Sequence, residues 1–199
     1  MNIANSRAIM LLLPALLAGL SGCASQQPAA DKPAHLYAMP YSVVATGDSR
    51  ADTTAATTFS WPAAPAAVNN ERGTTGAPVN ALLEEAIAAT LQQKGYRYSA
   101  AAGQGDLIVS YDYTLNDAAA DKQLAQKYGM QSDLNYTSPD PEQFEKGTLV
   151  IDVIERHSGL TAWRSSLQGF AYLQISAAER RQRIHSMVQR MLSGLPARN

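Results

Sequence analysis

The chain has 199 residues, and its 16 lysines and arginines against 17 aspartates and glutamates give a formal net charge of −1. A chain so close to neutral has no bulk attraction for nucleic acid, so we expect no nucleic-acid partner. Its single cysteine excludes an intramolecular disulfide and any metal site built on several cysteines.

The first 22 residues have the layout of an export signal. A short polar segment that carries Arg7 precedes an apolar run over residues 9–20, and small residues then lead to a cysteine. A membrane-spanning helix needs about 20 apolar residues, whereas this run is about 12 long and contains Pro14. We therefore predict a signal peptide over residues 1–22 that is removed on export.

The four residues Leu20-Ser21-Gly22-Cys23 resemble the lipobox of bacterial lipoproteins at every position. This resemblance implies cleavage between Gly22 and Cys23 and lipidation of the Cys23 thiol. The alternative is an ordinary secreted protein in which the cysteine falls there by chance. The position of the chain's only cysteine favours the lipoprotein.

The residues directly after Cys23 indicate to which membrane a lipoprotein is sorted. In Gram-negative lipoproteins an aspartate directly after the cysteine tends to retain the protein in the inner membrane, but here Ala24 and Ser25 follow. The resemblance therefore implies a lipid anchor in the outer membrane, with the protein on the periplasmic face. Residues 23–36 are small, polar and contain prolines, which is typical of a flexible tether.

The remaining 177 residues after cleavage (199 − 22) are enough for one domain, which we place at residues 37–195. Aromatic and β-branched residues predict strands over 37–46 and 57–61. A helix is predicted from Pro78, with an apolar stripe that ends at Lys94-Gly95. Tyr96-Arg97-Tyr98 can form a short strand after it.

The second half of the domain has the strongest strand patterns. Apolar residues alternate over 107–115 and again over 147–155, and a turn at 156–159 ending in glycine predicts a hairpin with 160–167. The pattern Ser176-Ala177-Ala178-Glu179 is a capping box and predicts the start of the last helix. This helix carries the one basic cluster of the chain, Arg180-Arg181-Gln182-Arg183.

Residues 116–146 are polar, and only 122–128 show a brief helical pattern, so we predict a long loop that is either mobile or functional. The complete pattern predicts an α+β fold. We expect a two-layer sandwich in which a mainly antiparallel sheet carries two helices on one face.

Several of these segments resemble a family of bacterial lipoproteins known as domain of unknown function 4136. The resemblance covers about residues 37–195, and its most specific parts are Lys94-Gly95-Tyr96 and the strand Gly147 to Asp152 that leads to Trp163-Arg164. The chain departs from the family at the turn 156–159 and in the expanded loop 116–146. The family has no established activity, so the resemblance implies a fold and a location but no chemistry.

The sequence shows no catalytic constellation. A Gly-x-Ser-x-Gly nucleophile motif and a glycine-rich phosphate loop are both absent. His35, His157 and His185 are scattered over the tether, a turn and a helix, so we expect no metal site and no cofactor. Asp106, Asp112 and Asp152 lie at a strand start or on the polar face of a strand, where solvation is their usual role. Trp61, Trp163 and the tyrosines suit packing, although Tyr111 and Tyr113 can line a pocket.

Two functional hypotheses follow. The first is a non-enzymatic lipoprotein that binds an envelope protein, peptidoglycan or a lipid through an open sheet face or the loop 116–146. The second is a hydrolase or transferase of envelope polymers. That reaction would need two of four carboxylates to meet in the fold, namely Asp106, Asp112, Asp152 and Glu155. The sequence favours the binding module.

Overall fold

A computed structural model describes residues 41–64, 69–71, 79–115, 118–129, 140 and 142–198. All of them belong to one compact unit, His35–Asn199. The predicted signal peptide, Cys23 and the predicted tether lie outside the described residues. None of the helices in the described ranges has the length and apolar character needed to cross a membrane.

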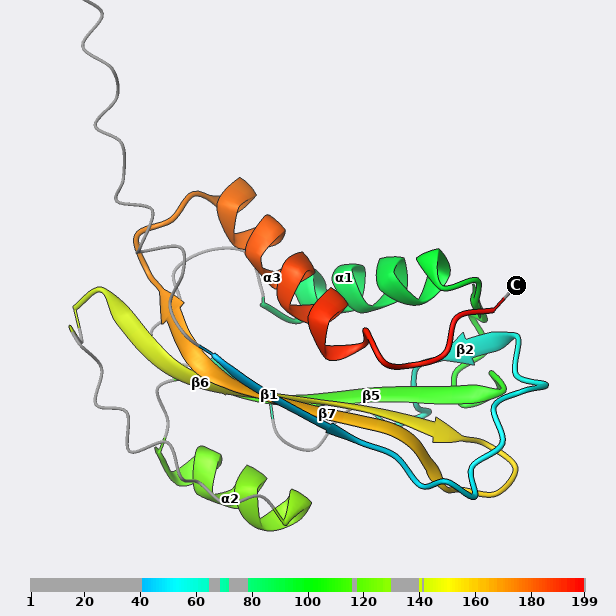
Figure 1. Cartoon of the computed structure of the whole chain (residues 1–199). Helices are drawn as coiled ribbons and strands as arrows, with labels where there is room; N and C mark the ends of the chain where they lie inside the picture. Colours follow the sequence, from blue (N-terminus) through cyan, green and yellow to red (C-terminus); the bar gives the residue numbers. More distant parts are fainter. Residues whose placement is uncertain are drawn as a thin grey trace, which may run out of the picture. The chain divides into compact units, whose positions relative to one another are not determined.

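Seven strands form one mixed sheet (Figure 1). The strands are β1 Ser42–Thr46, β2 Thr58–Ser60, β3 Asn69–Glu71, β4 Arg97–Tyr98, β5 Leu107–Leu115, β6 Phe144–Glu155 and β7 Thr161–Tyr172. Their order in space is β1-β7-β6-β5-β2-β4, and β3 pairs separately with β5.

The longest strands pair as predicted, because β1, β7, β6 and β5 are antiparallel neighbours. The sheet is nevertheless mixed, since β2 runs parallel to β4 and β5, and β3 runs parallel to β5. A helix separates β2 from β4 in the chain, and such a crossover brings the chain back to the same end of the sheet. The short pieces at this side of the sheet carry no pattern that reveals their direction.

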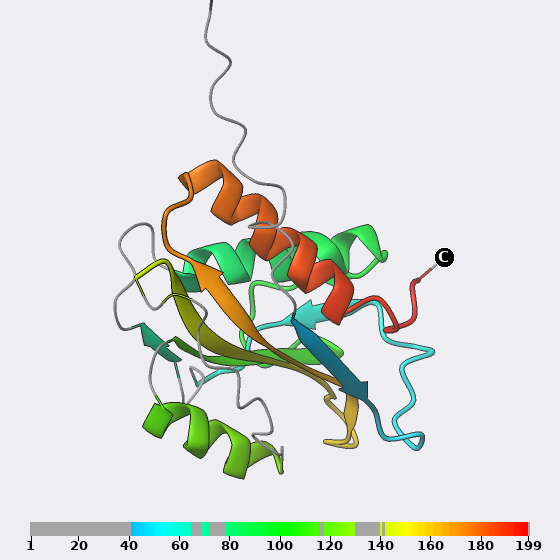
Figure 2. The ribbon, with the colours of Figure 1, turned by 60° about the vertical axis from the view of Figure 1, so that its left-hand side comes forward.

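Three helices pack on the sheet: α1 Val79–Gln93, α2 Ala118–Tyr128 and α3 Ala177–Met191. The helices α1 and α3 contact each other and cover one face, as predicted. The helix α2 contacts β5 and lies on the opposite face, which both views show (Figures 1 and 2). The predicted α+β fold with two helices on one face is therefore correct for α1 and α3 but omits α2. This third helix adds a partial third layer on the other face of the sheet.

The predicted loop 116–146 is also wrong in part. It contains α2, and β6 begins at Phe144 rather than at Gly147. Of the α2 side chains that are described, only Leu124 and Ala125 are buried. A helix with so narrow an apolar stripe shows only the brief helical pattern over 122–128, and its stability depends on contacts that the sequence does not show.

The core lies between the sheet and the pair α1 and α3. Alternate residues of β5 and β6 point into it, as their pattern predicts, and the buried stripes of both helices cover them. These core residues include Leu107, Val109, Tyr111, Tyr113, Leu149, Ile151, Val153, Leu82, Leu83, Ile87, Ile184 and Val188.

The predicted helix boundaries are confirmed by their capping contacts. Gly95 adopts a left-handed conformation with φ of 89°, and the Tyr96 amide donates to the Leu91 carbonyl at 3.0 Å. At the start of α3, the Glu179 amide donates to the Ser176 hydroxyl at 3.2 Å, and the Ser176 amide donates to the Glu179 carboxylate at 2.8 Å. Local sequence signals thus determine where both long helices end or begin.

Candidate functional site

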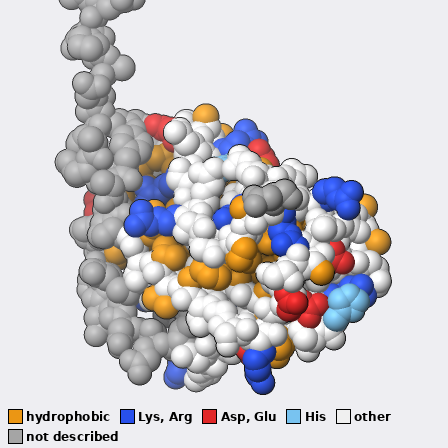
Figure 3. All heavy atoms as spheres, turned by 45° about the vertical axis from the view of Figure 1, so that its right-hand side comes forward, with side chains coloured by type: hydrophobic (Ala, Val, Ile, Leu, Met, Phe, Trp, Pro, Cys, Tyr) orange, Lys and Arg blue, Asp and Glu red, His pale blue; other side chains and the backbone are white. Residues whose placement is uncertain are grey.

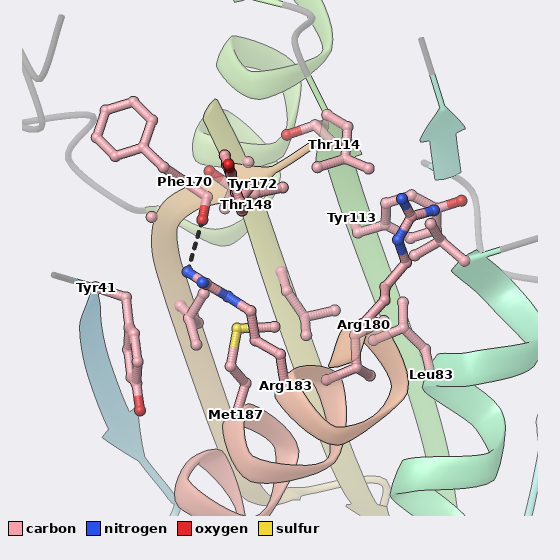
Figure 4. A pocket seen from close by; sticks show the side chains of 18 of the residues that line it. Tyr41, Leu83, Tyr113, Thr114, Thr148, Phe170, Tyr172, Arg180, Arg183 and Met187 are labelled. Carbon is pink, nitrogen blue, oxygen red and sulfur yellow. Dashed lines mark hydrogen bonds between the residues drawn. The ribbon is translucent and has the colours of Figure 1, made fainter. Parts of the chain in front are cut away.

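A cavity of about 120 Å³ opens between α1, α3 and the sheet (Figure 4). Most of its lining side chains are apolar. They come from three elements that are distant in sequence: Val79 and Leu83 of α1, Ile184 and Met187 of α3, and Tyr113, Leu149 and Leu167 of the sheet. Tyr41, the first described residue, also lines it.

Two glycines make room for this cavity. Gly147 of β6 pairs with Gly169 of β7, one core-facing position beyond the pair Leu149 and Leu167. A Cβ atom on Gly147 would lie 3.0 Å from the Thr114 carbonyl oxygen and 2.8 Å from Leu115 Cδ2, so a larger residue here would have to displace its neighbours. The row of core side chains is interrupted here, and the space between sheet and helices remains unfilled.

Two arginines from the start of α3 line the cavity. Figure 4 shows Arg183 pointing from α3 toward the backbone of β7, where its guanidinium donates to the Phe170 carbonyl at 3.0 Å. Burial lowers the pKa of the Arg183 guanidinium from its ordinary value. Arg180, one turn earlier, interacts electrostatically with the buried residue Glu145. Burial raises the pKa of the Glu145 carboxyl, and the positive charge of Arg180 offsets part of this rise.

The arginines of the basic cluster thus occupy two different environments in the structure. Arg180 and Arg183 line the cavity, whereas Arg181 is exposed and pairs with Glu85 at 3.2 Å. Of the two tyrosines that the sequence suggested for a pocket, only one lines the cavity. Tyr113 lines the cavity, but Tyr111 instead donates a hydrogen bond to Glu84 at 2.9 Å. The sequence gives no sign that Arg183, Met187 and the paired glycines line a cavity, although the glycines fall on the core-facing period of two.

The opposite face of the sheet holds a polar cluster beneath the end of α2. Asp112 of β5 is buried and accepts a hydrogen bond from the Tyr128 hydroxyl at 2.6 Å. It also forms an ion pair with Lys127. Burial, together with the hydrogen bond to Asp112, raises the pKa of the Tyr128 hydroxyl.

Asp152 extends this cluster on the neighbouring strand. Arg164 lies opposite it on β7 and donates two hydrogen bonds to its carboxylate, at 2.6 and 3.0 Å. The Arg164 guanidinium also stacks over the Tyr128 ring, 4.6 Å from its centroid. Asp112 and Asp152 are therefore not solvated as expected, because both are buried and each has a cationic partner.

The other two candidate carboxylates lie elsewhere. Asp106 accepts hydrogen bonds from the backbone amides of Thr57 and Thr58, at 2.8 and 2.9 Å, which hold its pKa at about 2. Glu155 accepts from Ser158 and His157 in the hairpin turn, and these bonds lower its pKa. The fold thus brings Asp112 and Asp152 to one cluster and uses Asp106 and Glu155 in local turns.

The described histidines are also separate. His157 is exposed in the hairpin turn, as predicted, and His185 lies half-buried on α3, while His35 lies outside the described residues. Within the described ranges, no three histidine, cysteine, aspartate or glutamate side chains gather as metal ligands would. On the face drawn in Figure 3, charged side chains of both signs are interspersed.

The family follows from a comparison with known families. The model described as "Domain of unknown function (DUF4136)" matches residues 43–197. The chain belongs to the DUF4136 family. The resemblance noted in the sequence is confirmed in this respect, and none of the curated proteins compared with the chain matches it.

The two segments on which the sequence resemblance depended most have structural roles here. Lys94 donates to the carbonyls of Ser193 and Leu195, at 3.1 and 2.7 Å, and the Tyr96 hydroxyl donates to Pro196 at 3.0 Å. The first motif therefore fastens the C-terminal segment. The second supplies the Asp152–Arg164 ion pair and the indole of Trp163, which donates to the Met191 carbonyl at 2.9 Å.

Three solved structures are similar to the chain. The PelC dodecamer from Paraburkholderia phytofirmans is 15% identical, with 80% of this chain and 100% of that chain covered and a TM-score of 0.48. A DUF4136 family protein from Bacteroides thetaiotaomicron is 14% identical, with 77% and 94% covered and a TM-score of 0.49. A PDZ domain protein from Parabacteroides distasonis is 18% identical, with 81% and 36% covered and a TM-score of 0.44. Likenesses at this level say nothing about a ligand or a partner.

Proposed function

We propose that this protein is a non-enzymatic outer-membrane lipoprotein whose folded domain binds an apolar ligand in the cavity between α1, α3 and the sheet. Its anchor is the lipid on Cys23, and its domain faces the periplasm. The export signal and the lipobox pattern in the sequence support the anchor. The apolar cavity is the observation that carries the binding role.

The open cavity leaves apolar side chains of α1, α3 and the sheet in contact with water. Apolar surface removed from water contributes about 25 cal/mol per Å². A ligand that fills the cavity gains this free energy and adds packing contacts. An apolar lining of this kind favours a hydrocarbon over peptidoglycan, since a sugar would bury hydroxyl groups without partners.

The rival hypothesis of a reaction on envelope polymers relies on carboxylates that lie away from this cavity. Asp112 and Asp152 occur on the other face of the sheet, and each is neutralised by a hydrogen-bonded cation. A general acid or base must instead reach the proton of a substrate. We therefore assign binding, and no reaction, to the domain.

The test is a titration with 1-octanol, a neutral apolar probe, followed by amide chemical shifts. The protein is used without residues 1–23, which comprise the predicted signal peptide and the predicted lipidated cysteine. We expect saturable shifts at residues that line the cavity. Met187→Trp places a bulky ring in the cavity and should abolish them. Ser186→Trp, at an exposed position of the same helix, is the matched control and should leave binding intact.

Two results would contradict the proposal. One is a titration that never saturates or whose shifts lie outside the cavity. The other is equal binding by the Met187→Trp variant and the Ser186→Trp control, because the probe would then occupy a different site.

A further inference from the structure

Arg183 is an unusual component of an apolar cavity. Its guanidinium has five N–H donors, and the described contacts use one of them, toward the neutral Phe170 carbonyl. None of the ion pairs in the described part of the chain involves Arg183. A half-buried cation without a carboxylate partner is costly unless an anion compensates it.

The other two arginines at the start of α3 differ from Arg183, because each has an acidic residue nearby. Arg180 lies close enough to Glu145 to lower the pKa of that carboxyl, and Arg181 pairs with Glu85 at the surface. Among the described residues, only Tyr41 acts electrostatically on the Arg183 guanidinium, whose pKa it raises, and no carboxylate does. Within the described ranges, four of its five N–H donors have no protein acceptor.

We infer that Arg183 binds the carboxylate of a single-chain fatty acid, whose hydrocarbon chain enters the adjacent cavity. This inference rests on the proposed binding function and names the ligand class for that site. The guanidinium fork matches a carboxylate in geometry and charge. The hydrocarbon chain of the fatty acid then contacts apolar side chains around Arg183, among them Leu83 and Met187.

The size and lining of the cavity favour a fatty acid over a peptide. A cavity of about 150 Å³ holds one benzene molecule, so the present volume of about 120 Å³ has room for about five carbons of a narrow alkyl chain, and a longer chain extends into the opening. A peptide C-terminus also carries a carboxylate, but its amide groups would need hydrogen-bond partners that this apolar lining largely lacks. A fatty acid has its polar atoms at one end only, where Arg183 lies.

The experiment compares octanoate with 1-octanol, two probes with chains of equal length and different heads, at neutral pH. In the form without residues 1–23, octanoate should bind about tenfold more tightly than 1-octanol, as expected for a charge-assisted pair. Arg183→Met should bring octanoate down to the affinity that the same variant has for 1-octanol. Arg181→Met removes the same charge from the same helix outside the cavity and should retain the preference.

A second measurement needs no variant and remains valid if Arg183→Met fails to fold. The side-chain Nε–H resonance of Arg183 should shift on addition of octanoate and stay in place on addition of 1-octanol. Absence of this difference would overturn the assignment to Arg183. So would equal affinity of the two probes for the unaltered protein, or a preference that survives Arg183→Met.

The outcomes separate this inference from the proposed function. If neither probe binds in the cavity, the proposed binding function itself fails. If 1-octanol binds there and octanoate has no advantage, only the role of Arg183 fails. If a peptide with a free C-terminal leucine displaces octanoate at lower concentration than octanoate itself binds, the ligand is a protein segment and the fatty acid is wrong.

Discussion

The hydroxyl of Tyr128, the last residue of α2, donates a hydrogen bond of 2.6 Å to the buried carboxylate of Asp112 in the middle of β5. This contact joins a helix with a narrow apolar stripe to the outer face of the sheet. Lys127 binds the same carboxylate, so two neighbouring residues of α2 hold one strand residue. The end of α2 thus owes its position largely to polar contacts.

Replacing Tyr128 with phenylalanine should therefore loosen α2. The change removes one hydrogen bond to a charged acceptor, which is worth about 1.5–3 kcal/mol, and leaves Asp112 with Lys127. We expect faster hydrogen exchange of the α2 amides, with little change in α1 and α3. Tyr98→Phe, at an exposed tyrosine, is the matched control. Unchanged exchange in α2 would show that the hydrogen bond does not hold the helix.

Removal of the arginine from the Asp152–Arg164 pair should destabilise the domain. Arg164→Met leaves the Asp152 carboxylate buried without its cation, and we expect a loss of about 2 kcal/mol in the free energy of unfolding. This is less than the 3–5 kcal/mol of a fully buried pair, because the Arg164 side chain remains 33% exposed. Urea unfolding measures the loss. Arg181→Met breaks an exposed pair and should cost under about 1 kcal/mol; an equal cost for both variants would contradict this ranking.

Asp106 should make the stability depend on pH in acid. Its pKa falls from the ordinary 3.8 to about 2 in the folded chain, first because the Thr57 amide donates to it. A lowered folded pKa stabilises the protein above the unfolded value, and this contribution is lost as the pH falls toward 2. Asp106→Asn should lower the urea midpoint at neutral pH, and the two midpoints should converge near pH 2. A constant difference across this range would refute the role of the charge.

Cys23 gives the test of the anchor. Cys23→Ser should abolish incorporation of labelled palmitate and release the protein from membrane fractions, because serine lacks the thiol that accepts the lipid. Ser25→Ala, two residues further along, should retain both properties. Continued labelling and membrane association of the Cys23→Ser variant would show that the chain is not a lipoprotein of this kind.

Sequence patterns predicted the parts of the fold that depend on local chemistry. The period of two in β5 and β6, the capping box at Ser176 and the glycine at the end of α1 each have a direct backbone cause, and all are confirmed. The helix α2 was missed because only Leu124 and Ala125 give it a buried stripe among its described side chains. The parallel direction of the short strands was not predicted, since two or three residues carry no signal about the strand with which they pair.

The candidate site was the least predictable part. Gly147 and Gly169 are 22 positions apart, and Val79 and Met187 are separated by most of the domain, yet all line one cavity. Three arginines close together in the sequence likewise do not reveal that Arg183 has no carboxylate partner in the described part of the chain. By itself, the sequence determined the secondary structure of the long elements and the family, because these depend on periodicity and on local capping. Only the tertiary structure decided which carboxylates are paired and where the apolar space remains, because both depend on strand register and on the packing of distant elements.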